Sequence, residues 1–312
     1  MRANFNLQLN FLRIALVLSV CVFITRSARC QQDPLYAQYI NNPMVINPAY
    51  AGLNDKFNGS ISYRNQWGGF EGNPTTVNVN SHMSIVNNKV GAGVLLVQDK
   101  IGSVQNTEFQ AAFSYKLKLQ DKTFSFGMQT GFINFRNNYN LLNLSDASDP
   151  AFVQNENITK PNLGVGVILQ SERYFFGLSV PRLLSTTISD GGQSYQLYQQ
   201  HYYAFGAYVI YLNERLRLKP SVLLKAVSGS PISADLNFNL NIDEKYSAGI
   251  FTRSFNAYGL MLQARFLEKY RFGYTFEVPT TNSVGTRFTT HELFLGIAMP
   301  VLNFHSRTFS NF

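Results

Sequence analysis

Residues 235–242 alternate strictly between polar and apolar side chains. Asp235 and three asparagines occupy every second position, and leucine, phenylalanine and isoleucine lie between them. Successive side chains of a β-strand point to opposite faces, so this period of two predicts a strand with one polar and one apolar face. The pattern recurs in residues 108–119 and 215–224, and residues 270–276 show it with aromatic side chains. We therefore expect an all-β chain built from two-faced strands.

Strand length separates the two environments in which such strands occur. A soluble β-sandwich also alternates, but soluble strands average about 5 to 6 residues, whereas tilted membrane strands need about 9 to 11. Most of the alternating segments here have the membrane length, and fourteen can be counted, an even number as in bacterial outer-membrane barrels. The predicted strands are 57–66, 75–85, 90–99, 106–119, 122–135, 161–170, 173–181, 201–212, 215–226, 232–242, 245–253, 257–266, 270–278 and 290–302.

The connections between these segments alternate in length. The link after every second strand is tight, and most of the intervening links are longer, which is typical of outer-membrane barrels. Ser254–Asn256 is an exception, because it is short on the long-loop side. The tight links are Asn87-Asn88, Gln120-Asp121, Ser171-Glu172, Asn213-Glu214, Asp243-Glu244 and 267–269, and the longer ones are 66–74, 136–160, 182–200 and 279–289.

A sheet that crosses a membrane must close into a barrel. Hydrocarbon offers no hydrogen-bond partner, so a sheet with open edges cannot cross a membrane. We therefore predict one transmembrane antiparallel β-barrel of the outer membrane over residues 56–304, followed by a C-terminal tail at 305–312. The apolar face would contact outer-membrane lipid, and the polar face would line the lumen. The competing interpretation is a large soluble β-sandwich with its apolar face buried.

The first thirty residues have the parts of a secretory signal peptide. A basic start precedes an apolar run over 11–24, which is too short to span a bilayer as a helix. We expect cleavage after Cys30. A lipid on Cys30 is the alternative, but Arg29 directly before it and Ser27 in place of leucine make a poor acceptor site. Because Cys21 is the only other cysteine, the exported chain would contain no disulfide.

The net charge of +8 does not indicate a nucleic-acid partner. Four of the 26 basic residues precede position 31, where there are no acids, so the rest of the chain has 22 basic residues against 18 acidic ones, a balance of +4. The basic residues are spread singly along the predicted strands and form no run that could follow a phosphate backbone. We expect no binding to nucleic acid.

No catalytic or metal-binding constellation is recognisable. Ser81 and His82 are neighbours on a predicted strand and point to opposite faces, so they do not form a hydrolase dyad. The histidines are far apart and no cysteine accompanies them, so we expect no metal site. We therefore predict no enzyme activity, no catalytic residue and no cofactor. The four histidines are His82, His201, His291 and His305.

Two features concern the expected lumen. Gly-x-Gly occurs at Gly91 and Gly93 and again at Gly164 and Gly166, inside predicted strands, where small residues let a side chain or an inserted segment approach the wall. The inward face also carries charges of both signs, which suggests a lumen filled with salt bridges or an anion-preferring pore. The inward charges are Lys116, Lys118, Arg215, Arg217, Lys225 and Arg265 against Glu108, Asp235 and Glu292.

Residues 31–55 form a lead segment that does not alternate. It is rich in Asn, Pro and Tyr, and its two Asn-Pro steps, at Asn42 and Asn47, favour turns over strands. Such a segment is expected to be a periplasmic lead or a plug that enters the lumen.

This lead closely resembles the opening of the PorP/SprF family, outer-membrane proteins of the type IX secretion system of the Bacteroidetes. The resemblance continues in family order through most of the chain, although the tail departs from the expected ending and reads HSRTF. The matching runs are QQDPLYAQYINNPMVINPAYAGL (31–53), YRNQWGGFEGNPTT (63–76), VQDKIG (97–102), YFFGLSVPRL (174–183), LKPSVLLKA (218–226) and SPISADLN (230–237).

The resemblance implies a role in protein secretion and not in catalysis. Family members look like outer-membrane partners that help to export, or hold at the surface, cargo proteins with a C-terminal sorting domain, including gliding adhesins, beside other components of the type IX machine. Two alternatives remain: a channel for solutes or hydrophobic compounds, and a barrel hydrolase.

Partner binding is expected in the lead and in the first long link. Trp67 and Phe70 could grip a partner, because aromatic residues often anchor interfaces, although an aromatic belt at the membrane boundary is the competing interpretation. The candidate residues are Asp33, Pro34, Tyr36, Gln38, Tyr39, Asn42, Pro43, Asn47, Pro48, Tyr50, Trp67 and Phe70.

Overall fold

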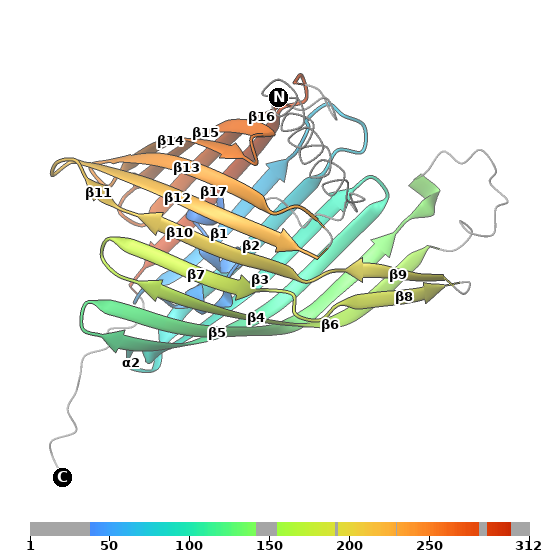
Figure 1. The fold of residues 1–312 in the computed structure, drawn as a ribbon, viewed down its shortest axis with the longest axis horizontal. Coiled ribbons are helices and arrows are strands. Elements are labelled where there is room, and N and C mark those ends of the chain that lie inside the picture. The colour runs from blue at the N-terminus through green and yellow to red at the C-terminus, as the bar shows by residue number, and fades with distance from the viewer. Residues whose placement is uncertain (1–37, 142–154, 191–192, 229, 281–285, 301–312) are drawn as a thin grey trace, which may run out of the picture.

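The computed structural model describes residues 38–141, 155–190, 193–228, 230–280 and 286–300. They form a closed antiparallel barrel of fourteen strands, in which β1 pairs with β17 and every other wall strand pairs with its neighbours (Figure 1). The predicted fold class is confirmed. The wall strands are β1 (Phe57–Asn65), β2 (Thr75–Ile85), β3 (Val90–Ile101), β4 (Val104–Leu119), β5 (Lys122–Asn137), β6 (Glu156–Gln170), β7 (Tyr174–Val180), β10 (His201–Tyr208) continued by β11 (Ile210–Tyr211), β12 (Leu216–Val227), β13 (Ser233–Ile242), β14 (Tyr246–Arg253), β15 (Ala257–Phe266), β16 (Tyr270–Pro279) and β17 (Thr290–Met299).

The two faces of the wall have the polarity expected of a membrane barrel. On β13, Asn237 is 2% exposed and points into the lumen, whereas its neighbour Phe238 is 51% exposed on the outer face. The same alternation runs along β4, where Gln110 is buried and Phe109 and Phe113 are exposed. A soluble sandwich would bury these apolar side chains, so the outward apolar surface excludes that alternative.

The tight turns gather at one rim, hereafter the tight-turn rim, and the longer connections at the other, the long-loop rim. Asn87 and Asn88 both adopt positive φ in the turn α2 (Val86–Lys89). Two-residue hairpin turns need this backbone conformation, because their twist then matches the twist of the two strands they join. Two boundaries differ from the prediction. β3 and β4 meet at Gly102-Ser103, so the long-loop rim has a second tight link besides Ser254–Asn256. The link predicted at 136–160 spans only 138–155, because β5 ends later and β6 begins earlier than predicted.

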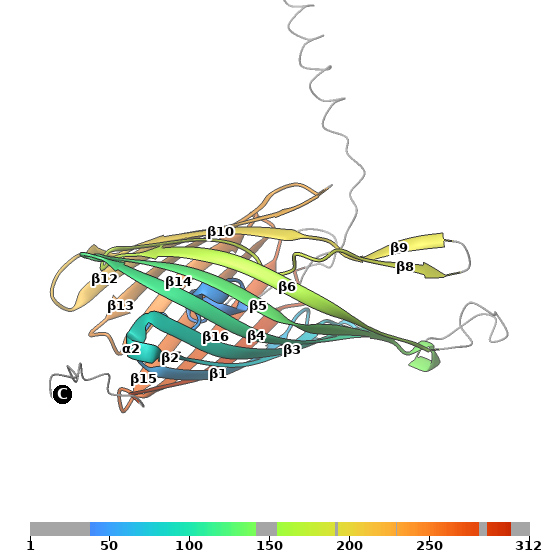
Figure 2. The same cartoon turned by 90° about the horizontal axis from the view of Figure 1, so that it is seen from below.

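One hairpin was not predicted. Within the link expected at 182–200, β8 (Thr186–Asp190) and β9 (Gln193–Tyr198) pair with each other and with no wall strand. They project beyond the barrel on the same side as the ends of β5 and β6 (Figure 2). Its two strands are only 5 and 6 residues long, shorter than the about 9 to 11 residues on which the prediction of wall strands relied.

The described part of the lead segment lies inside the barrel (Figure 1). Residues 38–53, hereafter the plug, contain three single turns, η1 (Gln38–Ile40), η2 (Pro43–Val45) and η3 (Pro48–Tyr50); a fourth, η4 (Tyr139–Leu141), lies at the long-loop rim. Both Asn-Pro steps start a turn with proline in its first position, where the absence of an N–H does no harm. Of the two locations expected for this segment, the lumen is therefore the observed one.

No helix among the described residues is long and apolar enough to cross a membrane. The predicted signal peptide at 1–30 and the tail at 305–312 lie outside the described residues.

Candidate functional site

The plug is clamped to the wall by Asn47. Its Nδ2 donates to the backbone carbonyl oxygens of Val167 on β6 and Leu178 on β7, each at 3.1 Å, and its Oδ1 accepts from the amide of Ala49 at 3.0 Å. One side chain thus caps its own turn and ties two wall strands to the plug. With a net contribution of about 1 kcal/mol for each bond, the clamp is a substantial part of the attachment.

Hydroxyl groups of the wall hold the plug backbone at three further points. Ser179 donates to the carbonyl of Ile46 at 2.6 Å, Ser125 to that of Ala49 at 2.7 Å, and Ser114 to that of Ala51 at 2.6 Å. These bonds satisfy carbonyl groups that a short irregular segment cannot pair internally.

The end of the plug nearest the tight-turn rim is held by polar groups around Gly52. The amide of Gly52 donates to Nδ1 of His82 at 3.0 Å, and Lys116 donates to the Gly52 carbonyl oxygen, to Ser84 and to Asn88. Lys116, expected from its sequence position to enter a lumenal salt bridge, binds backbone and neutral side chains instead.

Glycines of the wall make room for this close approach. A side chain on Gly91 would collide with the carbonyl of Ala51, and one on Gly166 would collide with Asn47. Gly127 faces the backbone of Ala49 in the same way. The prediction that Gly91 and Gly166 are packing positions for an inserted segment is confirmed.

Apolar contacts fill the remaining space around the plug. Tyr39 packs edge-to-face against Phe205 of β10 with ring centroids 5.7 Å apart, and its hydroxyl accepts a 2.5 Å hydrogen bond from Asn237. Burial raises the pKa of Tyr39 above its usual range, so the hydroxyl stays neutral. Met44 packs in a second cluster with Leu95 and Val97 of β3.

Ion pairs occupy the lumen toward the long-loop rim. Arg64 of β1 binds Glu292 at 3.1 Å and Glu277 at 3.0 Å, and all three side chains are buried. Asp235 receives Lys225 at 3.1 Å and Arg253 at 3.5 Å. Arg182, beyond β7, reaches across to Glu108 of β4 at 2.6 Å. The expected salt-bridged lumen is confirmed for this half.

Sequence reasoning missed four members of this network: Arg64, Arg182, Arg253 and Glu277. Arg64 carried a usable signal, because it follows Asn58, Ser60 and Ser62 at spacing two on the polar face of β1. Which carboxylate it binds depends on closure of the barrel between β1 and β17.

The candidate partner residues fall at two separate places. Tyr39, Asn42, Pro43, Asn47 and Pro48 are buried in the plug, and Tyr50 is half-buried there. Gln38 begins η1, whereas Asp33, Pro34 and Tyr36 lie outside the described residues.

Trp67 and Phe70 lie apart from the plug, in the β1–β2 loop at the long-loop rim. Trp67 has a positive φ of 55°, and its amide donates to Thr290 at 3.2 Å. Phe70 is exposed and packs edge-to-face on Phe288. Partner binding by either group stays a prediction.

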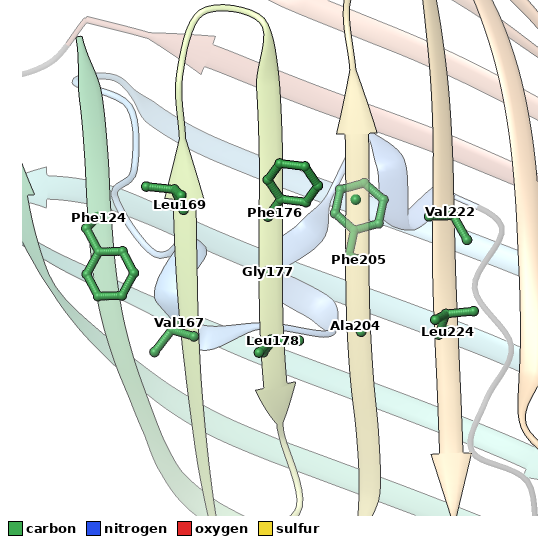
Figure 3. Close-up of a pocket in the computed structure, with 11 residues that line it drawn as sticks. Phe124, Val167, Leu169, Phe176, Gly177, Leu178, Ala204, Phe205, Val222 and Leu224 are labelled. Atoms are coloured by element: carbon green, nitrogen blue, oxygen red, sulfur yellow. The ribbon is translucent and has the colours of Figure 1, made fainter.

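An apolar hollow lies on the outer face between β5 and β12 (Figure 3). Ala204 and Gly206 are small outward positions on β10, and Phe176, Leu178 and Leu224 stand around them. The hollow faces the lipid side, and its almost wholly apolar lining suits that position.

No group of three or more His, Cys, Asp or Glu side chains placed to hold a metal ion occurs among the described residues.

The fold and its interior define a class: an outer-membrane β-barrel whose lumen holds an N-terminal plug. Residues 28–297 match the family model for the type IX secretion system membrane protein PorP/SprF, and the chain belongs to this family. The resemblance found in the sequence is thereby confirmed. No curated protein matches the chain significantly.

Solved structures with similar folds are outer-membrane proteins of low sequence identity. The TodX deltaS2S3 mutant, a monoaromatic hydrocarbon channel, has a TM-score of 0.50 and 10% identity, with 84% of this chain and 94% of that chain covered. A Pseudomonas aeruginosa FadL homologue has a TM-score of 0.48, 11% identity and coverage of 83% and 93%. Omp33 of Acinetobacter baumannii has a TM-score of 0.46, 10% identity and coverage of 80% and 99%. The likeness to TodX supports the fold alone.

Proposed function

We propose that this protein is an outer-membrane partner of the type IX secretion system that binds a secreted protein with a C-terminal sorting domain, such as a gliding adhesin, and helps to export it or retain it at the surface. Membership of the PorP/SprF family is the observation that carries this proposal. Other type IX components and outer-membrane lipid would be its further partners. We assign it no catalytic role.

The interior favours partner binding over solute passage. Hydrogen bonds hold the plug to β4, β5, β6 and β7. The ion pairs of Arg64 with Glu277 and of Arg182 with Glu108 occupy the lumen between the plug and the long-loop rim. A channel, the alternative carried by the sequence, requires the plug to leave these contacts. Ion currents through the purified protein in planar bilayers would favour the channel.

We place the main contact with cargo at the long-loop rim. The β8–β9 hairpin projects there, and Phe70 is exposed beside Trp67. Buried plug residues could meet a partner only after the plug leaves the wall, so their role in binding is secondary in this proposal.

The test is capture of a cargo C-terminal domain by the tagged protein in native outer membranes, identified by mass spectrometry. Trp67→Ala with Phe70→Ala, and separately replacement of residues 187–197 by a short Gly-Ser link, should each reduce capture at least tenfold. Leu267→Ala, at an 81% exposed residue of the tight-turn rim, is the matched control and should capture normally. Deletion of 33–47 tests the lead in the same assay: lost capture with an assembled barrel would support its part in binding. Normal capture by all the long-loop variants would overturn the proposed contact site.

A further inference from the structure

Strand β6 continues beyond the strand that covers its other side. β5 pairs with β6 along the whole of β6, from Gln170 to Glu156, whereas β7 pairs with β6 only as far as Val165. The part of β6 nearer the long-loop rim therefore has a hydrogen-bonded neighbour on one side and a free edge on the other. Barrels normally abolish such edges, because closure pairs every strand on both sides.

The edge is free because the chain turns inward after β7. The carbonyl of Pro181 accepts from the side chains of Gln129 and Asn162, at 3.0 and 2.9 Å, on the inner face of β5 and β6. A side chain on Gly164 would collide with this carbonyl, so the chain crosses β6 at a position without a Cβ. The next strand, β8, pairs with β9 alone, and this hairpin diverges from the ends of β5 and β6 (Figures 1 and 2).

The last bond on this edge shows which backbone groups are free. The amide of Leu183 donates to the carbonyl of Leu163 at 2.8 Å, so Leu163 points its backbone groups toward the edge. These groups alternate in direction along a strand, so Asn157 and Thr159 present their N–H and C=O groups there, and Pro161 presents its C=O. All three residues are exposed, and none of these groups has a backbone partner on that edge among the described residues.

Pro161 agrees with an unpaired edge at this place. Proline cannot donate to a ladder, and within sheets it is confined to edges, strand starts and bulges. Lysine and proline are also residues that native proteins place on edges to limit indiscriminate pairing, and Lys160 precedes Pro161. The edge is therefore open to full pairing only over Asn157 and Thr159, with the carbonyl of Pro161 as a further acceptor.

The two faces of the sheet exchange their polarity along this part of β6. Leu163 is exposed on the apolar outer face, whereas Thr159, on the same face, accepts a 2.8 Å hydrogen bond from Asn134 of β5. On the inner face, Ile158 lies opposite Phe135 of β5, and both are half-buried. The outward polar pair places this part of β6 outside the hydrocarbon, where water can hydrate the free backbone groups. A strand added at the edge would extend an apolar inner face and a polar outer one.

We propose that the free edge of β6 binds an extended segment of the secreted protein as an additional strand, through the backbone of Asn157, Thr159 and Pro161. Main-chain hydrogen bonds would supply the affinity and alternate side chains the specificity, as in other complexes formed by strand addition. The segment would direct apolar side chains toward Ile158 and Phe135 and polar ones toward solvent. This inference rests on the proposed function and specifies how the partner is held.

Hydrogen exchange at single-residue resolution tests the pairing directly. The purified full-length barrel in detergent is measured with and without a purified C-terminal sorting domain of a secreted protein. The amides of Asn157 and Thr159 should exchange at least tenfold more slowly in the complex. The amides of Ile158 and Lys160 point toward β5 and are the internal control, because the ladder to β5 protects them in both states.

Two substitutions at Thr159 separate the edge from its side chains. Thr159→Pro removes the N–H that faces the edge and leaves the ladder to β5, which does not use it. Thr159→Val keeps this N–H and loses only the hydroxyl that binds Asn134. Thr159→Pro should weaken binding of the sorting domain at least tenfold, and Thr159→Val should bind it like the wild type. Heat-dependent gel mobility checks that both variants have formed the barrel.

The outcomes distinguish this inference from the proposed function. Unchanged exchange at Asn157 and Thr159 in a complex that does form would overturn the inference and leave the proposed function standing. Equal affinities of the Thr159→Pro and Thr159→Val proteins would do the same. Failure of the wild-type protein to bind the sorting domain would overturn both.

Discussion

Asn47 fills the space that a side chain on Gly166 would need, so the plug fits against β6 only because residue 166 has no Cβ. The same asparagine donates to Val167, the next residue of β6. The residue that clamps the plug therefore packs directly against the backbone of β6.

Gly166→Leu should release the plug while the barrel still forms. The added side chain would occupy the place of Asn47, whereas the ladder between β6 and β7 uses backbone groups that the substitution leaves intact. The chain has only two cysteines, Cys21 and Cys30, both in the predicted signal peptide, so Ile46→Cys can serve as a single reporter. We expect maleimide labelling of this buried cysteine to be at least tenfold faster in the Gly166→Leu background.

Gly206→Leu is the matched control, because Gly206 is a wall glycine on the outer face. The atoms nearest to a Cβ there belong to the Phe176 and Val222 side chains, at 3.4 Å and beyond, which is ordinary van der Waals contact. It should leave labelling of Ile46→Cys slow. Equal acceleration by both substitutions would mean that the reporter senses general loosening of the barrel.

Arg64→Met should destabilise the barrel. It removes the guanidinium that binds the buried carboxylate of Glu292 at 3.1 Å, and removal of one member of a buried ion pair costs about 3 to 5 kcal/mol. The loss would appear as a lower midpoint of urea unfolding in detergent.

Glu292→Gln added to Arg64→Met should recover a large part of that loss, because the second substitution removes the buried negative charge that Arg64 no longer binds. Glu277 keeps Arg253 in both variants. A double variant less stable than Arg64→Met would contradict the ion-pair explanation.

The wall could be predicted because the membrane imposes one rule on every strand. Outward residues such as Phe238 must be apolar, inward ones such as Asn237 need not be, and the resulting period of two marks each strand in turn. The β8–β9 hairpin stands outside the wall, is under no such rule and was missed.

The site could be predicted only in part. The wall glycines and the lack of alternation in the lead indicated an inserted segment. Hydrogen bonds such as that from Ser125 to Ala49 depend on the path of the plug, and the plug sequence has no periodic pattern from which its path could be predicted. Ion pairs such as Arg182 with Glu108 join residues 74 positions apart, and a single sequence gives no register at that distance.

Phe238→Lys should hinder membrane insertion. Phe238 lies on the outer face near the middle of β13, and a lysine facing lipid costs about 2 to 4 kcal/mol at the bilayer midplane. Folding yield into lipid vesicles, read by heat-dependent gel mobility, should fall. Asn241→Lys, on the inward face of the same strand, should fold normally; a similar loss in both would argue against the assigned lipid face.

Asn47→Asp separates the two roles of the residue that clamps the plug. Aspartate can still accept from the amide of Ala49 and cap η3, but it has no N–H to donate to the carbonyls of Val167 and Leu178. It would also place a negative charge against two carbonyl oxygens. If the clamp holds the plug, Asn47→Asp should speed labelling of Ile46→Cys at least as much as Asn47→Ala does, although only the alanine variant loses the cap. Slow labelling in Asn47→Asp with fast labelling in Asn47→Ala would instead show that the plug is held through the shape of its turn, because the aspartate variant keeps that shape and loses only the bonds to the wall.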